Sequence, residues 1–197
     1  MRHTHIGHAP VFAQRLSFTG ETGWEIFVTP DFAEHVLEII LKAGQPLGLR
    51  LAGGEALNAL RIEKGFLHWG ADMAYTEAPY QLGLDFICKP GKTLPFIGQD
   101  ACLARKADPK GPCLRSVRLA DPDAILHHNE PVLRDGQIIG FVTSGAFCAM
   151  QKAAVGLCLV SPPDRAGRFE AVDDGPCSVM VEGREVPAEL RRKPFGA

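Results

Sequence analysis

The chain lacks most of the features that would place it in a functional class at once. No apolar run in its 197 residues approaches the roughly 20 residues that cross a bilayer, so we expect no membrane span. Basic residues are not in excess, because 21 Lys+Arg stand against 23 Asp+Glu. Without a broad basic face, nucleic-acid binding is not expected. The opening segment MRHTHIGHAP lacks the apolar core of a signal peptide, and we therefore expect a cytoplasmic protein.

Paired cysteines are also missing. The six cysteines are scattered along the chain and form no Cys-x-x-Cys motif: Cys88, Cys102, Cys113, Cys148, Cys158 and Cys177. A disulfide scaffold would be unusual in a chain of this length. We therefore expect reduced thiols that pack as small hydrophobic side chains, as in an intracellular protein.

Familiar nucleotide and hydrolase motifs fail on their spacing. Gly91-Lys92-Thr93 resembles the end of a phosphate-binding loop, but Phe86 stands where that motif needs glycine and Pro95 opposes the helix that should follow. Thr143-Ser144-Gly145 is not a nucleophile elbow, because Val142 occupies the first glycine position. A dinucleotide-binding glycine fingerprint is absent, so we expect no FAD site in this chain.

The histidines give no metal site and no catalytic base. His3, His5 and His8 could chelate a metal, but we expect them on a frayed terminus without fixed geometry. His127-His128 are adjacent, so their side chains diverge, and a solvated loop is expected there. His68 follows a helix end within an aromatic segment, and the sequence alone favours packing over acid–base work there. Catalytic residues stay unassigned, and no metal is expected.

The first half of the chain alternates strand and helix signals. Thr29 is a possible helix cap, and Pro30 suits the first helical position, where its missing N–H costs nothing. Gly65 is a plausible residue just beyond a helix end. The pattern predicts two strands, over 11–18 and over 24–28. It also predicts three helices: one over 30–43, one that begins at Glu55 and ends before Gly65, and one over 98–106.

The second half carries closely spaced strand signals. Runs over 113–119, 130–134, 137–143, 153–160 and 177–190 read as strands. Asp135-Gly136 and Glu182-Gly183 are hairpin dipeptides. These signals predict a small barrel or sandwich, with a domain boundary near 107–112.

One stretch, Leu16 to Glu25 (LSFTGETGWE), carries a possible site. A glycine-bounded turn between two strands would hold Glu25 near the start of the second strand, with Trp24 on the opposite face. In one interpretation, Glu25 is only the exposed member of an alternating strand. In the other, a fixed carboxylate beside aromatic rings accepts two N–H groups from a flat heterocycle that stacks on them.

Ordered motifs along the chain resemble those of a known family. Five motifs follow one another along the chain in this order: Leu16–Glu25, ALNALRIEKGFLHWG from Ala56, Phe96-Ile97-Gly98, GFVTSG from Gly140 and Lys193-Pro194-Phe195. Together they resemble the C-terminal half of the glycine-cleavage T-protein (aminomethyltransferase) family. The IEKGF and HWG pieces are most similar to the folate-binding regions of sarcosine and dimethylglycine dehydrogenases or oxidases.

The resemblance implies a fold, a cofactor and a site. The fold class it implies is α+β: a partial, ferredoxin-like folate-binding domain over 1–107, then a small antiparallel β-barrel over 112–197. Tetrahydrofolate accepts a one-carbon unit in this family, from an aminomethyl group or an N-methyl-derived iminium. The glutamate that binds the pterin ring falls on Glu25. Phe18, at a position often occupied by Tyr, and Trp24 are the aromatic candidates beside it.

Departures from the family pattern bear on activity. The catalytic aspartate of the family lies in an N-terminal half that has no counterpart here, so we expect the chain to be incomplete or inactive alone. Leu57 stands where T-proteins carry a folate-contacting arginine, which favours the dehydrogenase-like relatives. An N-terminal-half partner, a dehydrogenase subunit or a second copy would complete the site. Alternatives are a non-catalytic interaction subunit, or a fragment of a sarcosine or dimethylglycine dehydrogenase.

Overall fold

The computed structural model describes residues 1–89, 91, 94–107, 111–161 and 172–196. The chain divides into two compact units, Met1–Leu57 and Asn58–Ala197. Among the described residues, no helix combines the length and the apolar character that a membrane crossing needs.

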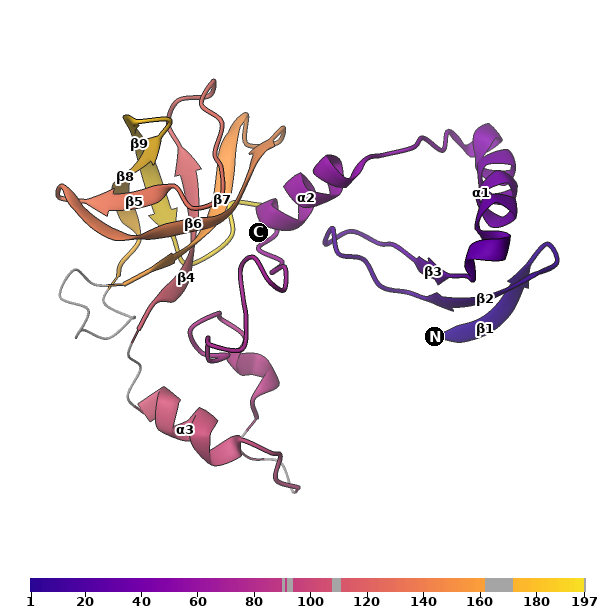
Figure 1. Cartoon of the computed structure of the whole chain (residues 1–197), viewed down its shortest axis with the longest axis horizontal. Helices are drawn as coiled ribbons and strands as arrows, with labels where there is room; N and C mark the ends of the chain where they lie inside the picture. Colours follow the sequence, from indigo (N-terminus) through magenta and orange to yellow (C-terminus); the bar gives the residue numbers. More distant parts are fainter. Residues whose placement is uncertain (90, 92–93, 108–110, 162–171, 197) are drawn as a thin grey trace. The chain divides into compact units, whose positions relative to one another are not determined.

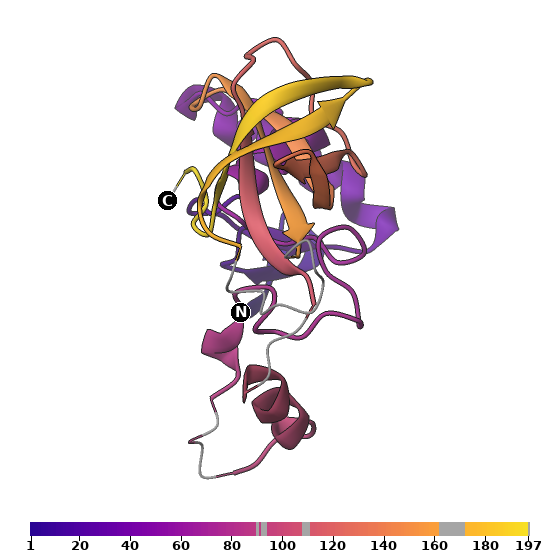
Figure 2. The same ribbon diagram turned by 90° about the vertical axis from the view of Figure 1, so that its left-hand side faces the viewer.

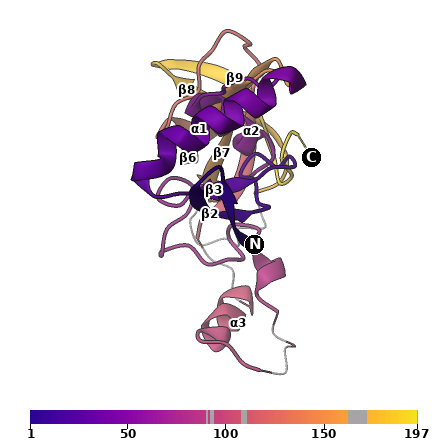
Figure 3. The ribbon, with the colours of Figure 1, turned by 90° about the vertical axis from the view of Figure 1, so that its right-hand side faces the viewer.

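The first unit is a three-stranded antiparallel sheet followed by a helix (Figure 1). Its strands are β1 (Arg2–Ile6), β2 (Ala9–Gln14) and β3 (Glu25–Phe27), in the spatial order β1-β2-β3. Helix α1 (Pro30–Gly44) and the short 3₁₀ turn η1 (Gln45–Leu47) complete the unit. Ala9 and Val11 of the sheet pack with Val36 of α1 to form a small core, and Figure 3 shows α1 beside the β2–β3 pair.

The frayed terminus expected for the first residues is wrong. Arg2–Ile6 forms β1, which pairs with β2 in the register His3↔Phe12 and His5↔Pro10. The pairing satisfies the backbone groups of the segment that face β2, and the His3 ring lies 4.9 Å from the ring of Phe12. Alternating histidines did not signal a strand, because the apolar neighbours that stabilise it lie on β2.

The hairpin before α1 has a longer loop than the sequence predicts. β2 ends at Gln14 and β3 begins at Glu25, so residues 15–24 form the connection. The hydroxyls of Ser17 and Thr19 hydrogen-bond at 2.8 Å within this loop, and the backbone of Gly20 has φ 74°. The predicted helix over 30–43 is confirmed, with Pro30 in its first turn. Thr29 takes the cap position but forms no side-chain capping hydrogen bond.

The second unit holds the remaining helices. α2 (Gly54–Glu63) starts in the first unit, which ends at Leu57, and continues into the second, where η2 (Asp85–Ile87) and α3 (Gln99–Ala107) follow it. α2 ends as predicted: Gly65 has φ 73°, and the Phe66 N–H donates to the Arg61 carbonyl at 2.8 Å.

A closed antiparallel barrel completes the second unit. Around the barrel the strands lie in the order β4-β7-β6-β5-β8-β9, and β9 pairs with β4. This closure leaves the barrel without an edge strand. Figure 2 shows the yellow β8–β9 hairpin beside the pink β4. The strands are β4 (Cys113–Leu119), β5 (Pro131–Arg134), β6 (Gln137–Cys148), β7 (Ala153–Val160), β8 (Gly175–Val181) and β9 (Arg184–Arg191).

The expected fold class, α+β with a small antiparallel barrel, is confirmed. Asp135-Gly136 and Glu182-Gly183 form the hairpin turns with positive φ at both residues of each pair. Buried valines such as Val117, Val132 and Val179 fill the barrel interior. The domain boundary predicted near 107–112 includes residues 108–110, which lie outside the described residues, and it stays a prediction.

Candidate functional site

The N-terminal sheet has two chemically different faces. Side chains alternate along a strand, so one set, which includes Val11, packs under α1 and the other set points the opposite way. The register pairs Phe12 with Phe27 and Gln14 with Glu25 on this opposite face. We call it the open face; it comprises His3, His5, Pro10, Phe12, Gln14, Glu25 and Phe27.

Glu25 is held in place on the open face. It opens β3 as predicted and is half-buried. The side-chain amide Nε2 of Gln14 donates a hydrogen bond to Glu25 Oε2 at 3.1 Å. Within the described part of the chain, Gln14 is the hydrogen-bonding partner of this carboxylate, and Glu25 Oε1 stays available as an acceptor. The arrangement is a fixed carboxylate that can accept further N–H donors.

Aromatic rings lie next to this carboxylate. The Phe12 and Phe27 ring centres are 6.0 Å apart with an interplanar angle of 44°. This pair is two residues along the strands from Gln14–Glu25, or about 7 Å on the same face. Phe27 is 51% exposed, so its ring is accessible. A shallow pocket of about 490 Å³ is lined in part by His3, Phe12 and Phe27.

The predicted aromatic partners of Glu25 lie elsewhere in the hairpin. Trp24 precedes β3 and is 62% exposed, and Phe18 is half-buried in the 15–24 loop. Their contact with a ligand stays a prediction. The rings that share the sheet face of Glu25 are Phe12 and Phe27, which the sequence reasoning missed. Strand alternation from Glu25 to Phe27 was the signal that could have identified one of them.

A second polar cluster lies buried in the other unit. The Arg61 guanidinium at the end of α2 forms an ion pair with Asp72, and the two side chains are 3% and 0% exposed. Arg61 also donates to Ser144 Oγ at 2.6 Å, and the Thr143 hydroxyl donates to Asp72 Oδ1 at 2.5 Å. The His68 backbone N–H donates to Asp72 Oδ2 at 2.9 Å. We call these residues the Arg61 cluster.

The Arg61 cluster holds three segments together rather than offering a binding surface. It joins the C-terminal end of α2, the loop around Asp72 and the middle of β6. Its charges are paired and hydrogen-bonded, as burial requires. Sequence reasoning considered Thr143-Ser144 as a failed hydrolase motif and as part of the family motif GFVTSG. It did not link them to Arg61, because 83 residues separate Ser144 from Arg61.

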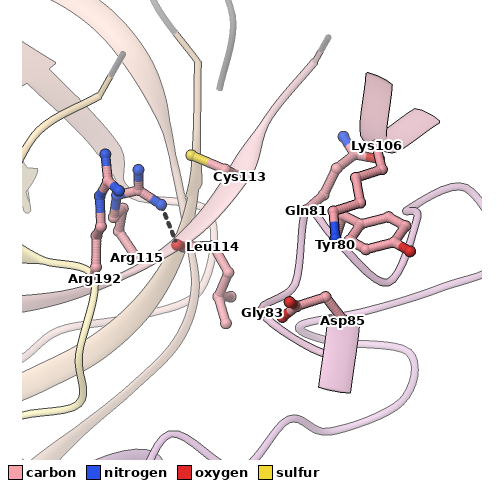
Figure 4. A pocket seen from close by; sticks show the side chains of 9 residues that line it. All are labelled: Tyr80, Gln81, Gly83, Asp85, Lys106, Cys113, Leu114, Arg115 and Arg192. Atoms are coloured by element: carbon pink, nitrogen blue, oxygen red, sulfur yellow. Dashed lines mark hydrogen bonds between the residues drawn. The ribbon is translucent and has the colours of Figure 1, made fainter. Parts of the chain in front are cut away.

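A pocket of about 360 Å³ lies between the α3 region and the start of the barrel (Figure 4). Figure 4 shows Tyr80, Asp85 and Lys106 on one side of it and Arg115 on the other. The buried Arg115 guanidinium already donates to the carbonyl oxygens of Val172 and Leu114 at 2.8–3.0 Å. Lys106 Nζ lies 5.3 Å from the centre of the Tyr80 ring. These cations are engaged within the protein, so the pocket is a weaker candidate for an anion site.

The buried thiols are unsuited to nucleophilic chemistry. Burial raises the pKa of Cys148 to about 12 and that of Cys177 to about 11. Burial also raises the pKa of Cys158 well above its ordinary value. Thiolates are the reactive form, so these side chains stay neutral and inert near pH 7. In the ranges that the structure describes, no three His, Cys, Asp or Glu side chains gather in a metal-binding group.

Comparison with protein families gives two matches along the chain. Residues 1–92 match the family described as the GCVT N-terminal domain. Residues 113–196 match the glycine cleavage T-protein C-terminal barrel domain. The second match begins at Cys113, where β4 starts.

Curated relatives and a solved structure agree with these matches. The chain is 40% identical to 4-methylaminobutanoate oxidase (formaldehyde-forming) of Paenarthrobacter nicotinovorans, over 98% of this chain and 23% of that protein. It is 39% identical to rat mitochondrial dimethylglycine dehydrogenase, over 96% and 22% of the two chains. It is 32% identical to the aminomethyltransferase of Halothermothrix orenii, over 95% and 50%.

The solved glycine cleavage system aminomethyltransferase T from Bartonella henselae shares the fold. Its TM-score is 0.79 at 22% identity, over 94% of this chain and 49% of that one. The chain therefore spans about half the length of the aminomethyltransferases it matches, and about a fifth of the longer oxidase and dehydrogenase relatives.

Proposed function

Because the chain belongs to the glycine-cleavage T-protein (aminomethyltransferase) family, we propose that it forms one wall of a tetrahydrofolate site in one-carbon or N-methylglycine metabolism. The observation that carries the proposal is the Glu25 carboxylate, fixed by Gln14 on the open face beside Phe12 and Phe27. Glu25 is the residue at the pterin-binding position of the family motif.

The residues present fit a pterin. A pterin ring offers adjacent N–H donors along one edge, and a carboxylate with a free oxygen accepts such donors in charge-assisted hydrogen bonds. The exposed Phe27 ring beside Glu25 provides an apolar surface for the flat heterocycle. When bound, tetrahydrofolate supplies the nitrogen atoms that accept a one-carbon unit. This chain binds and orients the ring through Glu25 and Phe27.

Catalysis needs groups beyond this wall. The matched relatives are at least about twice as long as the region that this chain covers, and the family's catalytic aspartate lies in the half without a counterpart here. Positioning of reacting groups supplies much of the rate in such a site, and half of a site positions them poorly. We expect activity only with a complementary half, which a separate chain, a dehydrogenase subunit or a second copy could provide.

A second candidate function is that of a non-catalytic interaction subunit. Exposed apolar side chains of the β2–β3 hairpin favour it: Trp24 at 62% exposure, and Phe27 on the open face at 51%. Clustered exposed apolar side chains are typical of protein-binding surfaces. In this interpretation the open face contacts a partner protein and folate does not bind.

A calorimetric titration with tetrahydrofolate separates the two candidates. We expect binding by the purified chain and a dissociation constant about 10- to 100-fold higher in Glu25→Ala, the loss typical of a hydrogen bond to a charged group. Glu34→Ala, an exposed acidic position on α1, is the matched control and should bind like the wild type. Absence of binding at millimolar folate, or equal binding by Glu25→Ala, would refute the folate site.

A further inference from the structure

We propose that Gln14 is a positioning residue of the folate wall: it holds the Glu25 carboxylate in the orientation that leaves Oε1 for the ligand. The inference rests on the proposed function, since it concerns the same site. Its basis is the hydrogen bond from Gln14 Nε2 to Glu25 Oε2 at 3.1 Å. Gln14 needs no contact with the ligand for this role.

The topology makes Gln14 the residue that can orient Glu25. In the sheet order β1-β2-β3, β3 is an edge strand whose neighbour within the sheet is β2. A carboxylate at the start of an edge strand has one cross-strand partner on its own face, and for Glu25 the register gives Gln14. A glutamate side chain without such a partner samples several rotamers.

The same pair closes the loop that carries the predicted aromatic residues. Gln14 ends β2, Glu25 begins β3, and residues 15–24 connect them. The hydrogen bond therefore joins the side chains at the two ends of a loop that contains Phe18 and Trp24. The side-chain amide of Gln14 thus holds the Glu25 carboxylate in place and also links the two ends of the 15–24 loop.

Fixing the carboxylate before binding should increase affinity. Immobilising a long side chain on binding costs free energy, and a side chain that is already ordered avoids most of this cost. Gln14→Met keeps the length of the side chain and removes both the donor and the acceptor. We expect it to raise the dissociation constant for tetrahydrofolate about 2- to 10-fold.

The binding test is a double-mutant cycle. Tetrahydrofolate affinity is measured for the wild type, Gln14→Met, Glu25→Gln and the double variant, with Glu34→Ala, at an exposed position of α1, as a control. If Gln14 acts through Glu25, Gln14→Met weakens binding in the wild type and has less than about a 2-fold effect in the Glu25→Gln background. Equal losses in both backgrounds, no loss at all, or a matching loss in Glu34→Ala would overturn the inference.

A ligand-free measurement keeps the inference separate from the proposed function. NMR scalar couplings that report the χ1 angle of Glu25 should indicate one rotamer in the wild type and rotamer averaging in Gln14→Met, with the amide spectrum of the sheet otherwise retained. One rotamer in both proteins would show that Gln14 does not position Glu25, whatever the folate affinity. If Glu25 is ordered by Gln14 but folate does not bind, the positioning contact stands and the proposed function fails.

Discussion

At the residue scale, the Arg61–Asp72 ion pair should contribute strongly to the stability of the second unit. Both side chains are almost fully buried, so neutralising Asp72 leaves the guanidinium charge without a counter-charge. We expect Asp72→Asn to lower the free energy of unfolding by about 3–5 kcal/mol. Urea denaturation followed by circular dichroism measures the loss.

Asp173→Asn is the control for this prediction. Asp173 pairs with Arg192 at 3.5 Å on the surface, where the side chains are 82% and 51% exposed. Solvent screens such a pair, and we expect the substitution to change stability by less than about 1 kcal/mol. Comparable losses in the two variants would contradict the structural role assigned to the Arg61 cluster.

The buried Cys148 thiol predicts a loss of stability at high pH. Burial raises its pKa from 9.0 to about 12, so the folded state keeps the proton that the unfolded state loses. The stabilising contribution is complete below about pH 9 and is lost as the pH rises toward 12. Urea unfolding at pH 7.5 and pH 10 should show a smaller pH-dependent loss in Cys148→Ala than in the wild type. An identical loss in both proteins would argue against burial of this thiol.

At the element scale, the end of α2 depends on Gly65. Its backbone has φ 73°, and a Cβ atom there would lie 2.4 Å from Pro194 Cγ. Gly83 has a similar φ of 71° but open space around it. Gly83→Ala should therefore cost about 1 kcal/mol for backbone strain alone, whereas Gly65→Ala adds a clash and should cost more. Thermal unfolding of both variants measures the difference, and equal shifts would show that Pro194 does not pack against Gly65 in solution.

The elements also show which parts of the fold the sequence could predict. Barrel strands were located because Asp135-Gly136 and Glu182-Gly183 require positive φ and mark their hairpins locally. β1 was missed because its stability comes from pairing with Phe12 and its neighbours rather than from its own residues. The Arg61 cluster joins residues that are 71 and 83 positions apart, and no local pattern connects them.

The candidate site also contains residues that the sequence could predict and residues that it could not. The place of Glu25 at the start of β3 was predicted from the turn signal before it, and its role in binding stays a prediction from the family motif. Gln14 and Phe12 could not be linked to Glu25 without the register of β2 and β3, and the predicted strand over 11–18 extended past the true end of β2 at Gln14. Register depends on the loop length, which the glycines at 20 and 23 made appear short.

At the scale of the whole molecule, we expect binding without turnover. The chain spans about half of the aminomethyltransferases it matches. In the function proposed above, Glu25 binds the ligand, and the catalytic aspartate comes from a complementary half. Purified chain should form no 5,10-methylenetetrahydrofolate from an aminomethyl or N-methyl donor. Addition of a complementary N-terminal half from a matched aminomethyltransferase, with the chain and with the Glu25→Ala variant, tests completion. Robust turnover by the chain alone would refute this account of its activity.

The most direct test of the folate wall is a map of where the ligand binds. Amide chemical shifts of the ¹⁵N-labelled chain are followed while tetrahydrofolate is added, at concentrations up to the millimolar range. The account predicts that the largest changes fall on β2 and β3 around Gln14, Glu25 and Phe27, and that they disappear in Glu25→Ala. Changes centred on the barrel, or none at saturating ligand, would contradict it.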